Sequence, residues 1–158
     1  MSIFILLIVF QIKHLLADYL LQNEYMLGKF KQRGWIMPLA AHSAVHGAFT
    51  MAIVYVYSSD LTLSIGLSGL DMALHFILDR VKASPNLLGK YKAIDRREYL
   101  ALTDELALAE WEADSTGIRL TKQKLSDKMR DNKIFWLSLG FDQMFHALTH
   151  YLIIYIII

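Results

Sequence analysis

The chain has 158 residues, of which 55% are hydrophobic and 20% charged, and its mean hydropathy is +0.35. This length allows one domain, and a formal net charge of +1 is far below that of a typical nucleic-acid-binding protein, so no nucleic-acid partner is expected. The absence of cysteine excludes disulfides, thiolate metal ligands and cysteine nucleophiles.

Four segments are long enough to cross a membrane as helices, which takes about 20 residues. They cover residues 3–26, 36–57, 61–83 and 134–157. Polar residues interrupt each segment, so a soluble helical bundle is the alternative. Near both ends, however, the chain is apolar on every face, as in IFILLIVF and YLIIYIII, which is typical of helices in contact with lipid. Because the N-terminus lacks a basic region and a cleavage site, we expect a retained helix and not a signal peptide. The predicted fold is all-α, a four-transmembrane-helix bundle.

The distribution of basic residues indicates the orientation of these segments. The connection between the first two contains Lys29, Lys31 and Arg33 and no acid, and the long connection over residues 84–133 is also rich in Lys and Arg. The connection over residues 58–60 has no basic residue. Since basic loops remain in the cytoplasm, we expect a multi-pass inner-membrane protein with both termini outside.

Residues 84–133 are the water-soluble part, predicted to be a cytoplasmic helical insertion between the third and fourth segments. We expect an amphipathic helix over residues 95–113, a turn at Ser115, Thr116 and Gly117, and a second helix from an N-cap at Thr121 to Arg130. A DNA-binding helix-turn-helix is an alternative, but acidic and basic residues alternate here, which favours a solvated helical hairpin.

All six histidines lie inside the four apolar segments, each with an ionisable residue four positions away. Residues with this spacing share one helical face. The resulting polar stripes are His14, Asp18 and Gln22; His42 and His46; Asp71, His75 and Asp79; and Asp142, His146 and His150. Because exposing such residues to lipid is too costly, we expect the stripes to face one another and to form one cluster in the cytoplasmic half of the bundle.

Imidazole and carboxylate groups in such a cluster are ligands for first-row metals, and a pair four residues apart can chelate one ion. The expected metal ligands are His14, His42, His46, His75, Asp142 and His146, with Asp18 and Asp79 as candidate general bases. These exceed the three or four ligands that one zinc ion needs. The surplus predicts either a second metal or residues that orient the ligands, for which Gln22, Asp71 and His150 are candidates.

Three other interpretations use the same residues. A hydrogen-bonded network could hold the helices together without chemistry. A haem could be bound between His46 and His146, although aspartates are an unusual haem environment. A proton or ion pathway would also need buried Asp and His.

Four stretches of sequence, HLLADYLLQ, AHSAVH, HFILD and FDQMFH, resemble a family of small bacterial and phage membrane proteins called domain of unknown function 3307. The resemblance covers the four apolar segments and implies key positions at His14, Asp18, Gln22, His42, His46, His75, Asp79, Asp142, Gln143 and His146. It implies no reaction, and the insertion over residues 84–133 is longer than expected for the family.

The functional hypothesis from the sequence is a membrane hydrolase with a divalent metal, zinc being the expected ion, in a site open to the cytoplasm. The basic residues at 29–33 would attract an anionic lipid or a small anionic substrate. A non-enzymatic membrane interaction or structural module is the alternative. The oligomeric state, including a homo-oligomer, is left open by the sequence.

Overall fold

The computed structural model describes residues 2–158, in which all regular secondary structure is helical and no strand is present. In chain order the helices are α1 (Ile3–Leu15), a π-helical turn η1 (Leu16–Leu20), a 3-10 helix η2 (Met26–Phe30), α2 (Ile36–Ser58), α3 (Leu61–Ala83), a 3-10 helix η3 (Leu88–Lys90), α4 (Arg96–Trp111) and α5 (Ser115–Ile157). The chain divides into two compact units, Met1–Gly89 with Gly140–Ile158, and Lys90–Leu139.

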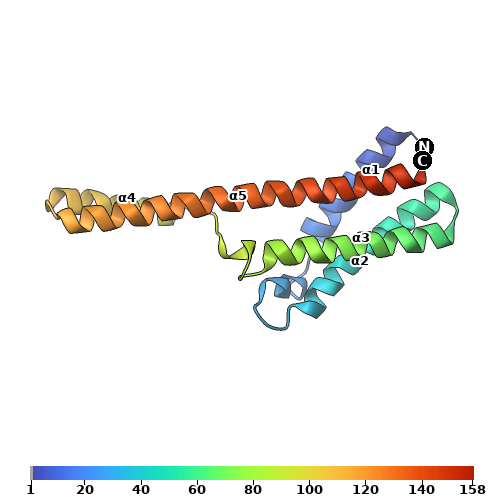
Figure 1. Ribbon diagram of the computed structural model, residues 1–158, viewed down its shortest axis with the longest axis horizontal. Helices are drawn as coiled ribbons and strands as arrows, with labels where there is room; N and C mark the ends of the chain where they lie inside the picture. The colour runs from blue at the N-terminus through green and yellow to red at the C-terminus, as the bar shows by residue number, and fades with distance from the viewer. Residues whose placement is uncertain (1) are drawn as a thin grey trace. The chain divides into compact units, whose positions relative to one another are not determined.

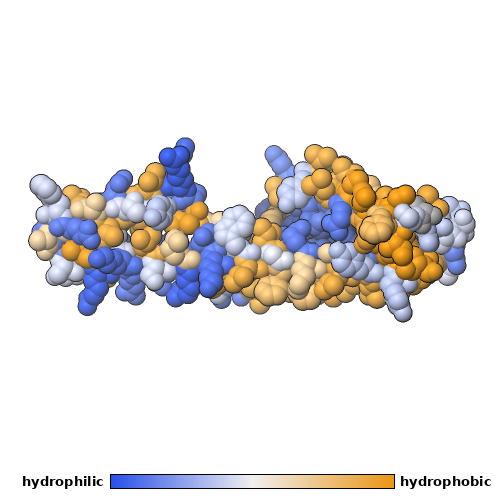
Figure 2. Space-filling model, turned by 90° about the horizontal axis from the view of Figure 1, so that it is seen from above, coloured by the Kyte–Doolittle hydropathy of each residue, from blue (hydrophilic) through white to orange (hydrophobic). Residues whose placement is uncertain are grey.

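In the first unit, α1, α2, α3 and the end of α5 lie side by side, and both termini are at the same end (Figure 1). At that end the core consists of hydrophobic side chains from all four helices: Leu6, Phe10, Val54, Leu67, Ile153 and Ile154. Hydrophobic residues also cover much of the outer surface, and hydrophilic residues gather in a recess between them (Figure 2). Polar groups thus face inward and apolar groups outward, as expected of helices in lipid.

Three helical segments are long and apolar enough to cross a membrane: Ile3–Leu20, Ile36–Ser58 and Leu61–Ala83. These segments indicate a membrane protein. The fourth segment expected from the sequence, residues 134–157, lies within α5 and is not among them, because polar residues such as Asp142, His146 and His150 lower its hydropathy.

The first apolar segment is shorter than expected, since its helix ends at Leu20 and not at Met26. Its last turn is π-helical, with the Leu21 amide donating to the Leu16 carbonyl at 2.9 Å. The Asn23 side chain then accepts the Met26 amide at 3.0 Å, which starts a separate turn.

Helices α2 and α3 approach closely at a glycine. The Ser68 hydroxyl donates to the Gly47 carbonyl at 2.8 Å, and a Cβ at Gly47 would lie 3.2 Å from the Ser68 carbonyl oxygen. Small residues at such contacts let membrane helices pack backbone to backbone. This approach places the polar stripes of α2 and α3 side by side.

The Lys90–Leu139 unit is a helical hairpin formed by α4 and the first part of α5. Ion pairs connect the two helices, including Lys124 with Glu105 at 2.8 Å, and the Thr121 hydroxyl also donates to Glu105. These bonds to Lys124 and Thr121 lower the pKa of Glu105. The prediction of a solvated helical hairpin agrees with this unit.

The details of that hairpin differ from the prediction. The turn is at Ala113, which has a φ of 51°, and Asp114 then accepts the Thr116 amide at 3.0 Å as an N-terminal cap. The expected turn at Ser115–Gly117 is therefore wrong: these residues form the first turn of α5. Thr121 is inside the helix and is not an N-cap.

Candidate metal centre

In the unit formed by Met1–Gly89 and Gly140–Ile158, four helices bring their polar stripes into one buried cluster. Going from the apolar core toward the other end of the bundle, each helix contributes three polar residues, and the middle one is a histidine in every helix. They are Lys13, His14 and Asp18 from α1 and η1; Thr50, His46 and His42 from α2; Asp71, His75 and Asp79 from α3; and His150, His146 and Asp142 from α5. Imidazole rings meet in the middle, where His75 stacks on His46 at 3.5 Å and on His146 at 3.9 Å between ring centroids.

One group in this cluster can hold a metal ion with three imidazoles and one carboxylate. In His14, Asp18, His46 and His75, one ligand atom from each residue lies within 4.8 Å of all the others. Asp18 is central, with Oδ2 3.3 Å from His14 Nε2 and Oδ1 3.0 Å from His46 Nε2. It belongs to the π-helical turn η1, and such turns are frequent at functional sites. Its side chain is 17% exposed, so water reaches the group from this side.

A second group, adjacent to the first, consists of Asp79, Asp142 and His146. His146 Nε2 lies 3.4 Å from Asp79 Oδ1 and 3.3 Å from Asp142 Oδ1. His42 connects the two groups, because its Nε2 is 3.3 Å from Asp18 Oδ1 and 3.1 Å from Asp79 Oδ2.

Three lysines pair with three of the four aspartates. Lys29 Nζ lies 2.7 Å from Asp79 Oδ2, and Lys82 Nζ lies 2.6 Å from Asp142 Oδ2. From the sequence, Lys29 was predicted to lie in a cytoplasmic loop that attracts an anionic substrate, and neither Lys29 nor Lys82 was predicted to pair with an aspartate of the cluster. The sequence next to Lys29 and Lys82 does not indicate these ion pairs, because the partners are 50 or more positions apart in the chain.

The third lysine, Lys13, lies in the middle of an apolar segment and is 2% exposed. Its Nζ is 2.6 Å from Asp71 Oδ2, which also accepts the Thr50 hydroxyl at 2.6 Å. Lys13 therefore pairs with an aspartate and does not extend to the membrane surface. Asp71 Oδ1 faces His75 Nδ1 at 3.6 Å, so this network borders the imidazole of a candidate ligand.

Many imidazole nitrogens in the cluster are buried without a hydrogen-bond partner. Within residues 2–158, no hydrogen-bond partner is present for either ring nitrogen of His14, His42, His75 and His146. The same is true of Asp142 Oδ1. Buried polar groups are normally paired, and exceptions need an explanation such as a bound ion. Ligands at about 2.0–2.1 Å from a tetrahedral zinc lie about 3.3–3.4 Å from one another, which matches several N···O distances in the cluster. The His/Asp groups of the cluster could therefore hold a metal ion.

The remaining predicted site residues have different surroundings. Gln143 donates to Asp142 Oδ2 at 3.1 Å, and His150 Nε2 lies 3.3 Å from Lys13 Nζ. Gln22 follows the π-helical turn and is half-buried, and within residues 2–158 it has no hydrogen bond to the cluster. A haem between His46 and His146 does not fit, because the His75 ring stacks between them.

The fold and the cluster define a class: an all-helical, membrane-type protein with a buried His/Asp group that could bind a metal ion. A family model described as "Protein of unknown function (DUF3307)" matches residues 4–107, and the chain belongs to this family. The resemblance seen in the sequence is thereby confirmed for the first three apolar segments. The match ends before residues 140–157 of α5, which supply Asp142 and His146. No curated protein and no solved structure matches the chain.

Proposed function

We propose that the protein is a metal-dependent membrane hydrolase whose metal, zinc as the favoured ion, is held by His14, Asp18, His46 and His75. The observation that carries this proposal is the convergence of these four ligand atoms, together with the ring nitrogens of His14 and His75, which are buried and have no hydrogen-bond partner among the described residues. A divalent cation with such ligands activates water for hydrolysis at neutral pH.

The charges around the cluster support one cation at this position. Asp71, Asp79 and Asp142 each pair with a lysine, whereas Asp18 has histidines as its only ion-pair partners among the described residues. A buried charge needs compensation, and a cation beside Asp18 would provide it. The exposed side of Asp18 leaves access for water and substrate. Asp18 and Asp79, which both contact His42 Nε2, are the carboxylates placed to accept the proton that water releases.

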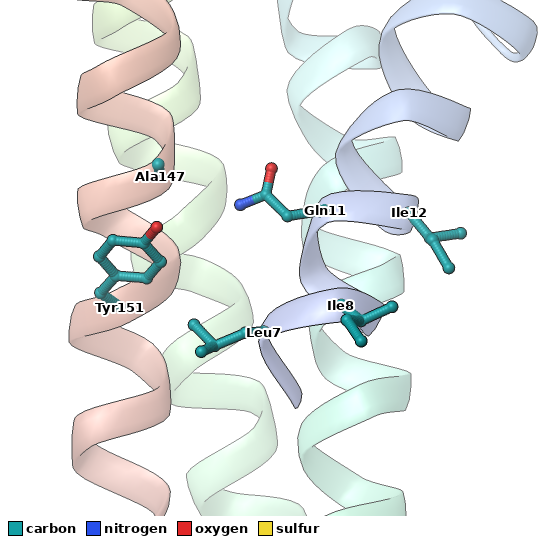
Figure 3. A pocket seen from close by; sticks show the side chains of 6 residues that line it. All are labelled: Leu7, Ile8, Gln11, Ile12, Ala147 and Tyr151. Carbon is teal, nitrogen blue, oxygen red and sulfur yellow. The ribbon is translucent and has the colours of Figure 1, made fainter. Parts of the chain in front are cut away.

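An anionic membrane lipid is the proposed substrate. Lys29 and Lys82 provide positive charge next to the second group of ligands. A pocket of about 420 Å³ lies between α1 and α5, lined by Leu7, Ile8, Gln11, Ile12, Ala147 and Tyr151. Gln11 points across it toward α5 (Figure 3) and precedes His14 by three residues, so the two share one face of α1. The mostly apolar lining suits an acyl chain beside the metal site.

Metal content tests the proposal. Purified in detergent, the wild-type protein is expected to contain at least one equivalent of zinc, manganese or iron and to hydrolyse an anionic lipid in mixed micelles. The double variant His42→Ala/His46→Ala is expected to lose the ion bound by His46 and the activity. A folded wild-type protein without bound metal would favour the non-enzymatic module, and a Soret absorbance band would revive the haem alternative.

We also propose that residues 134–157 form a fourth span, with both termini outside and residues 84–133 in the cytoplasm of a cell with an inner membrane. The absence of cysteine gives a clean background for a labelling test. In intact spheroplasts a membrane-impermeant maleimide is expected to label Ser2→Cys and not Ser126→Cys, which lies on α5 in the Lys90–Leu139 unit. Lysis should expose both, and the opposite pattern in intact spheroplasts would reverse the orientation.

A further inference from the structure

We infer that the cluster binds a second divalent cation, held by Asp79, Asp142 and His146, next to the cation of the proposed function. The inference rests on that function and extends it from one metal to a pair. Its basis is the point at which the Oδ1 atoms of both aspartates and His146 Nε2 converge.

The geometry at this point is that of ligand atoms around an ion. His146 Nε2 lies 3.3 and 3.4 Å from the two Oδ1 atoms, but neither contact is a hydrogen bond, and His146 Nε2 and Asp142 Oδ1 are both buried and unpartnered. His146 is 1% exposed, so its ring is shielded from bulk solvent. Edges of about 3.3–3.4 Å are those of a tetrahedron of ligands around zinc.

The two lysines do not compete for this point. Each binds the opposite oxygen of its aspartate, Lys29 at Asp79 Oδ2 and Lys82 at Asp142 Oδ2, and Gln143 also donates to Asp142 Oδ2. A hydrogen bond or ion pair to one oxygen of a carboxylate fixes the direction in which its other oxygen points. Carboxylates that bind metals are usually held in this way. A proton on His146 could compensate the two carboxylates in place of a cation, and manganese loading distinguishes the two.

The two sites differ in their ligand sets. The first offers three imidazoles and one carboxylate, whereas the second offers two carboxylates and one imidazole. Oxygen-rich sites suit harder cations such as manganese or magnesium, and imidazole-rich sites suit zinc. Contacts of His42 with Asp18 and Asp79, together with the stacking of His75 on His146, place the sites next to each other.

Manganese loading tests this inference in the full chain. After chelation and reloading with manganese alone, the wild-type protein is expected to bind two ions per chain and to give an exchange-coupled electron paramagnetic resonance spectrum. Asp142→Asn is expected to bind one ion and to give the six-line spectrum of isolated manganese. Lys82, the partner of Asp142, is 31% exposed and can be hydrated in this variant.

His146→Gln is the second variant, since it leaves both lysine pairs intact, and it is expected to behave as Asp142→Asn does. Asp104→Asn is the matched control, on the exposed surface of α4. One ion per chain in the wild type with an uncoupled spectrum, unchanged by Asp142→Asn, would overturn the inference. If that single ion is lost in His42→Ala/His46→Ala, the proposed function stands without the second cation. No bound ion in the wild type would overturn both.

Discussion

Lys13→Met is expected to lower the free energy of unfolding by about 3–5 kcal/mol, because it leaves the carboxylate of Asp71 buried without its cation. The side chains of Lys13 and Asp71 are 1% and 0% exposed, and their charged atoms are 2.6 Å apart. After the substitution, Asp71 would retain only the hydrogen bond from the Thr50 hydroxyl and its contact with His75. Unfolding by sodium dodecyl sulfate in mixed micelles measures the loss.

The double variant Lys13→Met/Asp71→Asn is expected to recover most of this stability. Removing both charges leaves neither position 13 nor position 71 with an unpaired buried charge. Replacing a buried ion pair by uncharged residues is often neutral or stabilising. Lys31→Met, at an exposed lysine, is the control and should change the free energy of unfolding by less than about 0.5 kcal/mol. A loss in Lys13→Met no larger than in this control would mean that water reaches Asp71.

Asp18→Asn is expected to weaken metal binding by more than about 100-fold, since even the loss of a group that only orients a ligand costs 10–100-fold. Unlike the other aspartates of the cluster, Asp18 has no lysine among its ion-pair partners, so its removal does not leave a buried ammonium unpaired. The variant is therefore expected to fold, and its amide oxygen can still accept the hydrogen bond from His46.

Zinc titration with a competing chelator measures this effect, and hydrolysis is expected to fall with the metal. Asp104→Asn again provides an exposed Asp-to-Asn change on α4, with no expected effect on zinc affinity. If Asp18→Asn binds zinc as the wild type does, the ion does not lie at the His14, Asp18, His46 and His75 group.

Local regularities in the sequence predicted much of the fold. Runs of apolar residues gave α2 and α3 nearly to the residue, and the spacing of four identified the polar face of each helix. Helix ends were less predictable, because they depend on individual side-chain bonds. The Asn23 side chain accepts the Met26 amide where η2 begins, and Asp114 accepts the Thr116 amide where α5 begins. A periodic pattern does not reveal either bond.

The sequence by itself determined that His14, His42, His46, His75 and His146 are buried on inward faces, because exposing them to lipid is too costly. Only the tertiary structure decided how they are divided. One group consists of His14, Asp18, His46 and His75, the other of Asp79, Asp142 and His146, and His42 lies between the two. The tertiary structure alone also paired each lysine with its aspartate. The physical reason is that helical periodicity fixes which way a side chain points, whereas the partner it meets depends on how the helices pack across the bundle.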